Sequence, residues 1–283
     1  KRAIFSTWQE YQGLGLLAGN GHAAELPRLI FIYLLSFIAP INLIRQIYVF
    51  TMLLTGALGV YFLIKTVFNK NSPVAFIGSL FYLLNLMTVQ TFYVPFEPMI
   101  THYGFLPWLI LSLIYFLENN TKKALFFFIT INILAIPQGQ VPTVFLVYLF
   151  VFAIILVSFN LREKRKELFN KSLKAIFLTF IINAFWLLPF LYFAITNSNV
   201  ALDAKINQMA TQTVILQNKA FGDIESVMLL KGFWFNNVDP DLTGKFAYML
   251  KPWRDQLTNP FIVYIGYLFF AVILIGLISS IKT

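Results

Sequence analysis

Polar side chains that could do chemistry lie in three short stretches beside long apolar runs. These are Glu97, His102 and Trp108 in "YVPFEPMITHYGFLPW", Gln138 and Gln140 in "IPQGQVPT", and Asn183 and Trp186 in "INAFWLLPF". A carboxylate such as Glu97 could act as a base or bind a cation, the alternative being a solvated acid in a turn between Pro95 and Pro98. The glutamines could hydrogen-bond a sugar or a lipid head group, or could cap helix ends.

The aromatic and imidazole side chains in these stretches have simpler alternatives. His102 could be an interfacial histidine hydrogen-bonded to backbone. Trp108 and Trp186 are also typical of the aromatic belt at a membrane surface. Polar groups next to apolar spans are nevertheless costly unless they face a cavity or a partner, so a water-accessible pocket would explain why they gather.

A fourth stretch, "WQEYQGLGLLAGNGHAAELPR", contains Trp8, Glu10, Gln12 and His22. Its "GLGLLA" satisfies the G-x-G-x-x-[GA] pattern of a dinucleotide-binding loop. That fold needs a buried strand before the loop and a long helix after it. Here the preceding residues are polar and the following "GNGH" breaks a helix, so we expect a glycine-rich loop at the membrane surface instead.

The composition requires a membrane as the surrounding solvent for most of the chain. Of the 283 residues, 59% are apolar and only 12% are charged, whereas soluble domains have about 25% charged residues. With about 20 apolar residues as the length of a span, the sequence predicts seven spans. They lie at 43–64, 74–92, 103–117, 124–137, 142–160, 175–196 and 259–280. The shorter segment 28–39, between Pro27 and Pro40, is expected to lie at the interface without crossing.

Basic residues sort to one side of this arrangement. If the N-terminal segment is outside, the inner loops hold Lys65, Lys70, Lys122, Lys123, Arg162, Lys164, Arg165, Lys166, Lys171, Lys174 and Lys282, while the outer turns 93–102 and 138–141 hold no Lys or Arg. This is the positive-inside pattern, so the net charge of +9 reflects topology rather than nucleic-acid binding. We expect a multi-pass plasma-membrane protein with a cytoplasmic C-terminus.

The predicted fold is an all-α polytopic membrane helical bundle with a long extracytoplasmic loop. It divides into a first outer loop with an interfacial helix (1–42), a six-span core (43–196), the extracytoplasmic loop (197–258) and a seventh span (259–283). The loop is too long and too aromatic to be a simple connector, and such loops often carry function. Without cysteines, the chain has no disulfides or thiolate metal sites.

In their order along the chain, the segments "STWQEYQGLGLLAGNGHAAELPRLIFIYLLSFIAP", "GSLFYLLNLMTVQTFYVPFEPMITHYGFLPWLIL" and "NAFWLLPFL" resemble a family of membrane enzymes. They are similar to the membrane region of the α-(1→3)-arabinofuranosyltransferases, within the GT-C superfamily of polytopic glycosyltransferases. The resemblance implies a GT-C-like fold, a polyprenyl-phosphate sugar donor such as an arabinofuranose donor, and a cell-envelope glycan or glycolipid acceptor on the outer face. Membrane lipids are the remaining expected partners.

The resemblance also suggests roles for individual residues. The base in such enzymes is usually an acid in the first outer loop or at the outer end of the first span, and we expect that span to be missing upstream of "KRAIF". Within the chain, Glu10 and Glu97 are then the catalytic candidates. Trp8, Gln12, His22, Arg28, His102, Gln138, Gln140 and Trp186 are the candidate substrate-binding residues.

The leaving phosphate would be stabilised by a divalent cation or by an arginine. Arg28 and Arg45 lie near the expected outer interface and could serve, or could be snorkelling anchors. Two other functions stay open from the sequence: a flippase or transporter of lipid-linked glycans, and an inactive membrane protein of the same fold.

Overall fold

The structure is a computed structural model that describes residues 8–9, 16–17, 21–67, 72–163, 166–196, 216, 219, 222–240 and 244–281. The chain forms two compact units. Unit 1 consists of residues 1–83 and 95–201, and unit 2 consists of residues 84–94 and 202–283.

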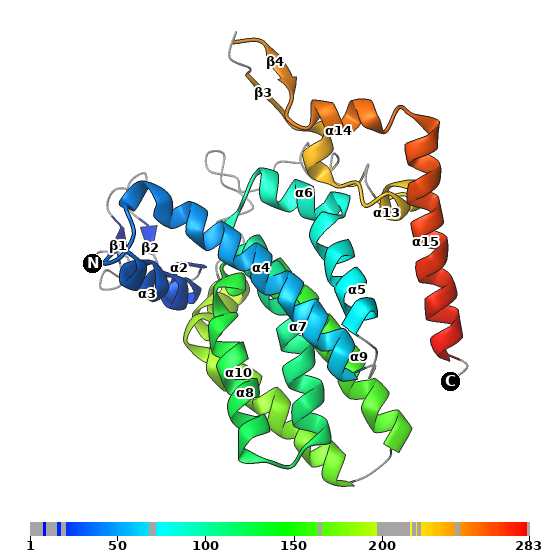
Figure 1. Cartoon of the computed structure of the whole chain (residues 1–283). Coiled ribbons are helices and arrows are strands. Elements are labelled where there is room, and N and C mark those ends of the chain that lie inside the picture. Colours follow the sequence, from blue (N-terminus) through cyan, green and yellow to red (C-terminus); the bar gives the residue numbers. More distant parts are fainter. Residues whose placement is uncertain are drawn as a thin grey trace. The chain divides into compact units, whose positions relative to one another are not determined.

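Unit 1 is built almost entirely from helices. Its elements are β1 (Trp8–Gln9), β2 (Leu16–Leu17), α2 (Gly21–Ala24), α3 (Leu26–Leu35), α4 (Ile41–Val67), α5 (Ser72–Leu84), α7 (Glu97–Glu118), α8 (Lys122–Leu134), the 3₁₀ helix η1 (Ile136–Gln140), α9 (Pro142–Glu163) and α10 (Lys166–Thr196). Strands β1 and β2 pair antiparallel, with Trp8 opposite Leu17. The helices α7 to α10 run side by side as a bundle (Figure 1).

Five helices of the described residues are long and apolar enough to cross a membrane. They are α4, α7, α9, α10 and α15 (Pro260–Ile281), and the number becomes six if α5 and α6 (Leu86–Tyr93) form one bent span. These lengths confirm an α-helical polytopic membrane protein. The exact count of seven spans stays a prediction.

Three sequence expectations can be compared with the helix ends. The segment 28–39 overlaps the short helix α3 (Leu26–Leu35), ten residues long, as expected for a helix that does not cross. The segment 74–92 is interrupted at Asn85, whose side chain accepts a hydrogen bond from the Thr88 N–H and so begins a new helix. The segment 124–137 overlaps α8, which begins at Lys122 and ends at Leu134 before Pro137; the chain continues as η1.

The packing of α4 against α7 depends on glycines. A Cβ on Gly56 would lie 2.6 Å from the Tyr103 ring, and one on Gly104 would lie 3.0 Å from the Met52 carbonyl oxygen. Small residues allow the backbones of membrane helices to approach this closely. The Trp108 indole N–H also donates to the Thr55 carbonyl at 2.9 Å, so α4 and α7 are tied together along most of their length.

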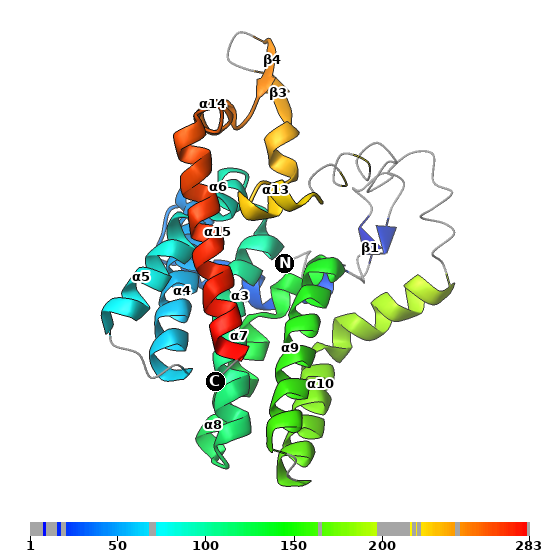
Figure 2. The same cartoon turned by 90° about the vertical axis from the view of Figure 1, so that its right-hand side faces the viewer.

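The core of unit 1 lies among α7, α8, α9 and α10, which are again adjacent in the turned view (Figure 2). Its fully buried members include Phe128, Leu109 and Trp186. One buried polar bridge joins two of the helices, because Tyr148 Oη donates to Asn132 Oδ1 at 3.0 Å. These contacts form the scaffold on which the ends of α7 and η1 are positioned.

Unit 2 contains a membrane-length helix and several short elements. They are α6, α13 (Ile224–Met228), the 3₁₀ helix η2 (Phe233–Asn236), β3 (Val238–Pro240), β4 (Phe246–Tyr248), α14 (Lys251–Gln256) and α15. Strands β3 and β4 form an antiparallel hairpin with Asp239 opposite Ala247. Arg254 holds α14 to this hairpin, since its guanidinium lies 4.0 Å from the Tyr248 ring centroid.

Candidate functional site

A buried ion pair is formed at the beginning of α3. Arg28 Nε donates to Glu25 Oε1 at 2.9 Å, and Arg28 Nη2 bonds Glu25 Oε2. The side chains are only 15% and 7% exposed. Glu25 lies in the turn before α3 and Arg28 lies three residues later on its first turn, so the sequence spacing itself places the two groups together.

The surroundings of Arg28 favour its charged form. Burial lowers the pKa of the Arg28 guanidinium, but its hydrogen bonds to the Glu25 carboxylate and the charges of Glu25 and Glu97 together raise the pKa above its usual value. The arginine therefore remains a fixed cation at this position. We call Glu25 and Arg28 the buried pair.

A second ion pair joins α4 to α7. Arg45 Nε donates to Glu97 Oε1 at 2.9 Å, and Arg45 Nη2 donates to the Pro95 carbonyl at 2.8 Å. Here the side chains are 61% and 20% exposed, so we call Arg45 and Glu97 the exposed pair. Glu97 is the first residue of α7, where a carboxylate is also stabilised by the helix dipole.

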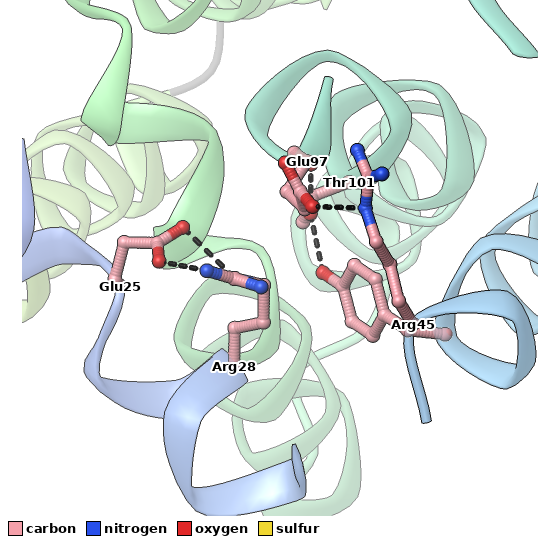
Figure 3. Close-up of polar contacts among 6 residues, drawn as sticks. Glu25, Arg28, Arg45, Glu97 and Thr101 are labelled. Atoms are coloured by element: carbon pink, nitrogen blue, oxygen red, sulfur yellow. Dashed lines mark hydrogen bonds and ion pairs between the residues drawn. The ribbon is translucent and has the colours of Figure 1, made fainter. Parts of the chain in front are cut away.

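Tyr48 and Thr101 connect the two pairs, and Thr101 lies beside Glu97 (Figure 3). The Thr101 hydroxyl donates to the Glu97 carbonyl at 2.7 Å, so the Tyr48 hydroxyl, 2.5 Å away, must donate to Thr101 Oγ1. On the other side, the Arg28 guanidinium lies 5.9 Å from the Tyr48 ring centroid. The six residues therefore form one polar cluster at the beginning of α7.

His102 and Gln138 form a further contact at this end of unit 1. His102 Nδ1 lies 2.7 Å from Gln138 Oε1, and because a carbonyl oxygen only accepts, Nδ1 carries the proton. Gln138 is buried on η1, and Gln140 on the same turn is half-buried. Two predicted site residues that are 36 residues apart in sequence are thus hydrogen-bonded to each other.

Trp186 has a supporting place in the structure. It is fully buried, and its indole N–H donates to Asn183 Oδ1 at 2.8 Å. A Cβ on Gly139 would lie 2.5 Å from Trp186 Cζ2. The ring thus packs under η1 and fixes the turn that carries Gln138, and it presents no surface to a substrate.

The remaining predicted residues belong to the first segment of the chain. Glu10 and Gln12 lie outside the described residues, as do the side chains of Trp8 and His22. Their proposed roles stay predictions.

The structure adds Glu25, Tyr48 and Thr101 to the residues expected at this site. Only Glu25 has a local sequence signal, its spacing of three residues from Arg28. Tyr48 and Thr101 are separated by 53 residues, and their contact follows from the packing of α4 on α7.

The cluster combines one accessible carboxylate with two arginines. A carboxylate can accept a proton from a hydroxyl, and a guanidinium can bind a phosphate through paired N–H groups. Among the described residues, no three His, Cys, Asp or Glu side chains are grouped in a way that could hold a metal ion. The cationic side chains of the cluster are Arg28 and Arg45.

A cavity of about 260 Å³ lies at the opposite end of α7. Leu117, Glu118, Asn120, Phe159, Glu163, Glu167, Leu168 and Lys171 line it. Within it, Lys171 Nζ donates to the Leu117 carbonyl at 3.2 Å and lies 3.5 Å from Glu167 Oε1. Leu117 is 20 residues after Glu97 on α7, about 30 Å along the helix, so this cavity is separate from the polar cluster.

Comparison with known families identifies a family of membrane proteins. The family described as "6-pyruvoyl-tetrahydropterin synthase related domain; membrane protein" matches residues 24–221. No curated protein and no solved structure matches the chain. The chain belongs to this family of membrane proteins, and the match includes the whole polar cluster.

Proposed function

We propose that this membrane protein is a glycosyltransferase of the GT-C type, which transfers a sugar from a polyprenyl-phosphate donor to a cell-envelope glycan on the outer face. The observation that carries the proposal is the exposed pair, a carboxylate and an arginine held together where two membrane-length helices begin. The resemblance in sequence supports the same function, with arabinofuranose as the candidate sugar.

Glu97 is suited to accept a proton. Its Oε1 is bonded to Arg45, while Oε2 has no hydrogen bond to the part of the chain that the structure describes. Thr101 and Tyr48 fix the backbone of the first turn of α7 through their hydrogen bonds. The Glu97 carboxylate on this turn is therefore positioned before a substrate arrives. Such preorganisation is what a general base requires.

Arg45 is suited to bind the phosphate of the donor. Its side chain is largely exposed and already donates through Nε and Nη2. A donor phosphate at the membrane surface would compete with Glu97 for the Nε N–H and with the Pro95 carbonyl for the Nη2 N–H. Binding of the donor would then release the carboxylate at the moment when a base is needed.

The proposed step is a substitution at the anomeric carbon. The acceptor hydroxyl oxygen forms the new bond to that carbon while its proton passes to Glu97. The bond between the anomeric carbon and the phosphate oxygen breaks, and the polyprenyl phosphate leaves with the electron pair. Arg45 stabilises the negative charge that develops on this leaving group.

The test compares two glutamates at opposite ends of α7 in the full-length protein in proteoliposomes. Glu97→Gln should lower transfer from a radiolabelled polyprenyl-phosphate arabinofuranose by about 10²- to 10⁴-fold, the contribution of a general base. The control Glu118→Gln changes the charge at the other end of the same helix and should leave the rate unchanged.

Three outcomes would contradict the proposal. One is equal transfer by Glu97→Gln and the parent protein. Another is movement of the labelled lipid across the bilayer without a new glycosidic bond, which identifies a flippase. The third is binding of the donor with no turnover, which identifies an inactive protein of this fold.

A further inference from the structure

The short helix α13 of unit 2 has both of its ends capped. At its beginning the Ser226 N–H donates to Asp223 Oδ2 at 3.3 Å. At its end the Leu230 N–H donates to the Val227 carbonyl and the Lys231 N–H donates to the Ser226 carbonyl, at 3.2 and 2.8 Å. This is a Schellman motif, in which Leu230 takes the left-handed position with φ of 54°. A leucine is strained in this conformation, so the turn is held by its surroundings.

Gln90 of α6 holds this turn from the side. Its Nε2 donates to the Leu230 carbonyl at 2.7 Å, and its Oε1 accepts from the Gly232 N–H at 2.9 Å. The Gln90 side chain is fully buried. One side-chain amide thus satisfies a backbone acceptor and a backbone donor that are two residues apart, as a neighbouring strand would do.

The same turn packs against the membrane-length helix α15. Leu229 is 5% exposed, and a Cβ on Gly266 would lie 2.5 Å from Leu229 Cδ2. Gly266 is six residues beyond the start of α15 at Pro260, a distance of about 9 Å along the helix. Leu229 is therefore beside a part of α15 that lies within the apolar span.

The opposite face of α13 is apolar and uncovered. Ile224 and Val227 are 76% and 55% exposed, and their spacing of three residues places them on one side of the helix. Among the neighbouring charged side chains, Lys231 Nζ donates to Glu225 Oε1 at 2.8 Å, and Asp223 accepts from the Ser226 N–H. The 20-residue stretch Pro260–Ser279 of α15 is long and apolar enough to cross a membrane, so lipid is its expected neighbour.

We propose that α13 and the turn 229–232 form an interfacial membrane element whose exposed face, Ile224 and Val227, contacts lipid acyl chains. Non-helical backbone is tolerated at this depth only when its polar groups have protein partners, which is what the caps of α13 and the amide of Gln90 provide. Helices of this kind bury their apolar face about 5–10 Å into the boundary between head groups and acyl chains, in agreement with the position of Gly266. The inference is independent of the proposed glycosyl transfer.

The absence of cysteine from the chain allows a direct test by site-directed spin labelling. The single variants Ile224→Cys and Val227→Cys are labelled in the full chain in lipid nanodiscs, and collision rates with oxygen and with a water-soluble nickel chelate are compared. Leu268→Cys, on the exposed surface of α15, is the lipid control, and Asp239→Cys, on the exposed hairpin, is the aqueous control.

Labels at 224 and 227 should resemble the label at 268, with the ratio of oxygen to nickel collisions raised severalfold over that at 239. A ratio equal to that at 239 would place α13 in water and overturn the inference. Low collision rates with both reagents would also overturn it, because protein rather than lipid would then cover the face.

Discussion

The two ion pairs of unit 1 use the same chemical groups in opposite ways. The buried pair joins residues three apart, and its side chains are 7% and 15% exposed. The exposed pair joins residues 52 apart on α4 and α7, and its arginine is 61% exposed. One pair is formed by the local sequence and closed to solvent, whereas the other is formed by helix packing and open to it.

This difference separates a structural role from a chemical one. A buried charge that loses its partner is strongly destabilised, while an exposed pair contributes little to stability. The buried pair therefore stabilises the beginning of α3, and the exposed pair has side chains that a ligand can reach. Experiments that remove one group at a time can test whether stability and chemistry separate in this way.

The largest effect on stability is expected for Glu25→Gln. It leaves the buried guanidinium of Arg28 without a counter-charge and should lower the free energy of unfolding by about 3 kcal/mol. Unfolding in mixed detergent micelles, followed by circular dichroism, measures this change.

The matched control removes both charges. The double variant Glu25→Leu with Arg28→Leu should be within about 1 kcal/mol of the parent, because no buried charge is left unpaired. If Glu25→Gln is as stable as the parent, the assignment of a structural role to the buried pair is wrong.

A smaller effect is expected for Tyr48→Phe, which tests the link between the pairs. It removes the hydrogen bond to Thr101 and should lower the free energy of unfolding by about 1 kcal/mol. Tyr33→Phe, on the exposed part of α3, should cause no measurable change. Equal effects of the two variants would show that Tyr48 does not connect the pairs.

Glu97→Gln should change stability still less, by about 0.5 kcal/mol, because its partner Arg45 remains solvated. The same variant is the one expected to lose glycosyl transfer. A loss of several kcal/mol in the unfolding measurement would instead make Glu97 a structural residue and would remove the distinction between the pairs.

The smallest effect concerns salt. The stability difference between the parent and Arg45→Gln should shrink as the salt concentration rises, since solvent-exposed charges are screened. The difference between the parent and Glu25→Gln should stay nearly constant over the same range. Parallel salt dependence of the two differences would contradict the assigned exposures.

Much of the fold could be predicted from the sequence because lipid selects long apolar helices. The non-crossing segment 28–39 and the spans near α9, α10 and α15 follow from length and apolar content alone. The break at Asn85 was missed although asparagine is a common helix N-cap, because apolar residues continue on both sides of it. The end of α8 before Pro137 was missed for the same reason.

The candidate site was predicted only where polar residues interrupt apolar runs. Glu97, His102 and Gln138 were found in this way, but the hydrogen bond between His102 and Gln138 depends on how η1 packs and has no sequence signal. Tyr48 and Gln90 were missed because single tyrosines and glutamines are common near the ends of membrane helices. Their roles depend on partners 53 and about 140 residues away.

The glycine contact between α4 and α7 has a consequence for the exposed pair. Gly56 lies eleven residues after Arg45 on α4, about 16 Å along the helix. A change of about 10° in the crossing angle would therefore move Arg45 by about 3 Å relative to Glu97, enough to break their contact. Membrane helices adjust their tilt to the hydrocarbon thickness. We therefore expect the contact between Arg45 and Glu97 to depend on the thickness of the bilayer.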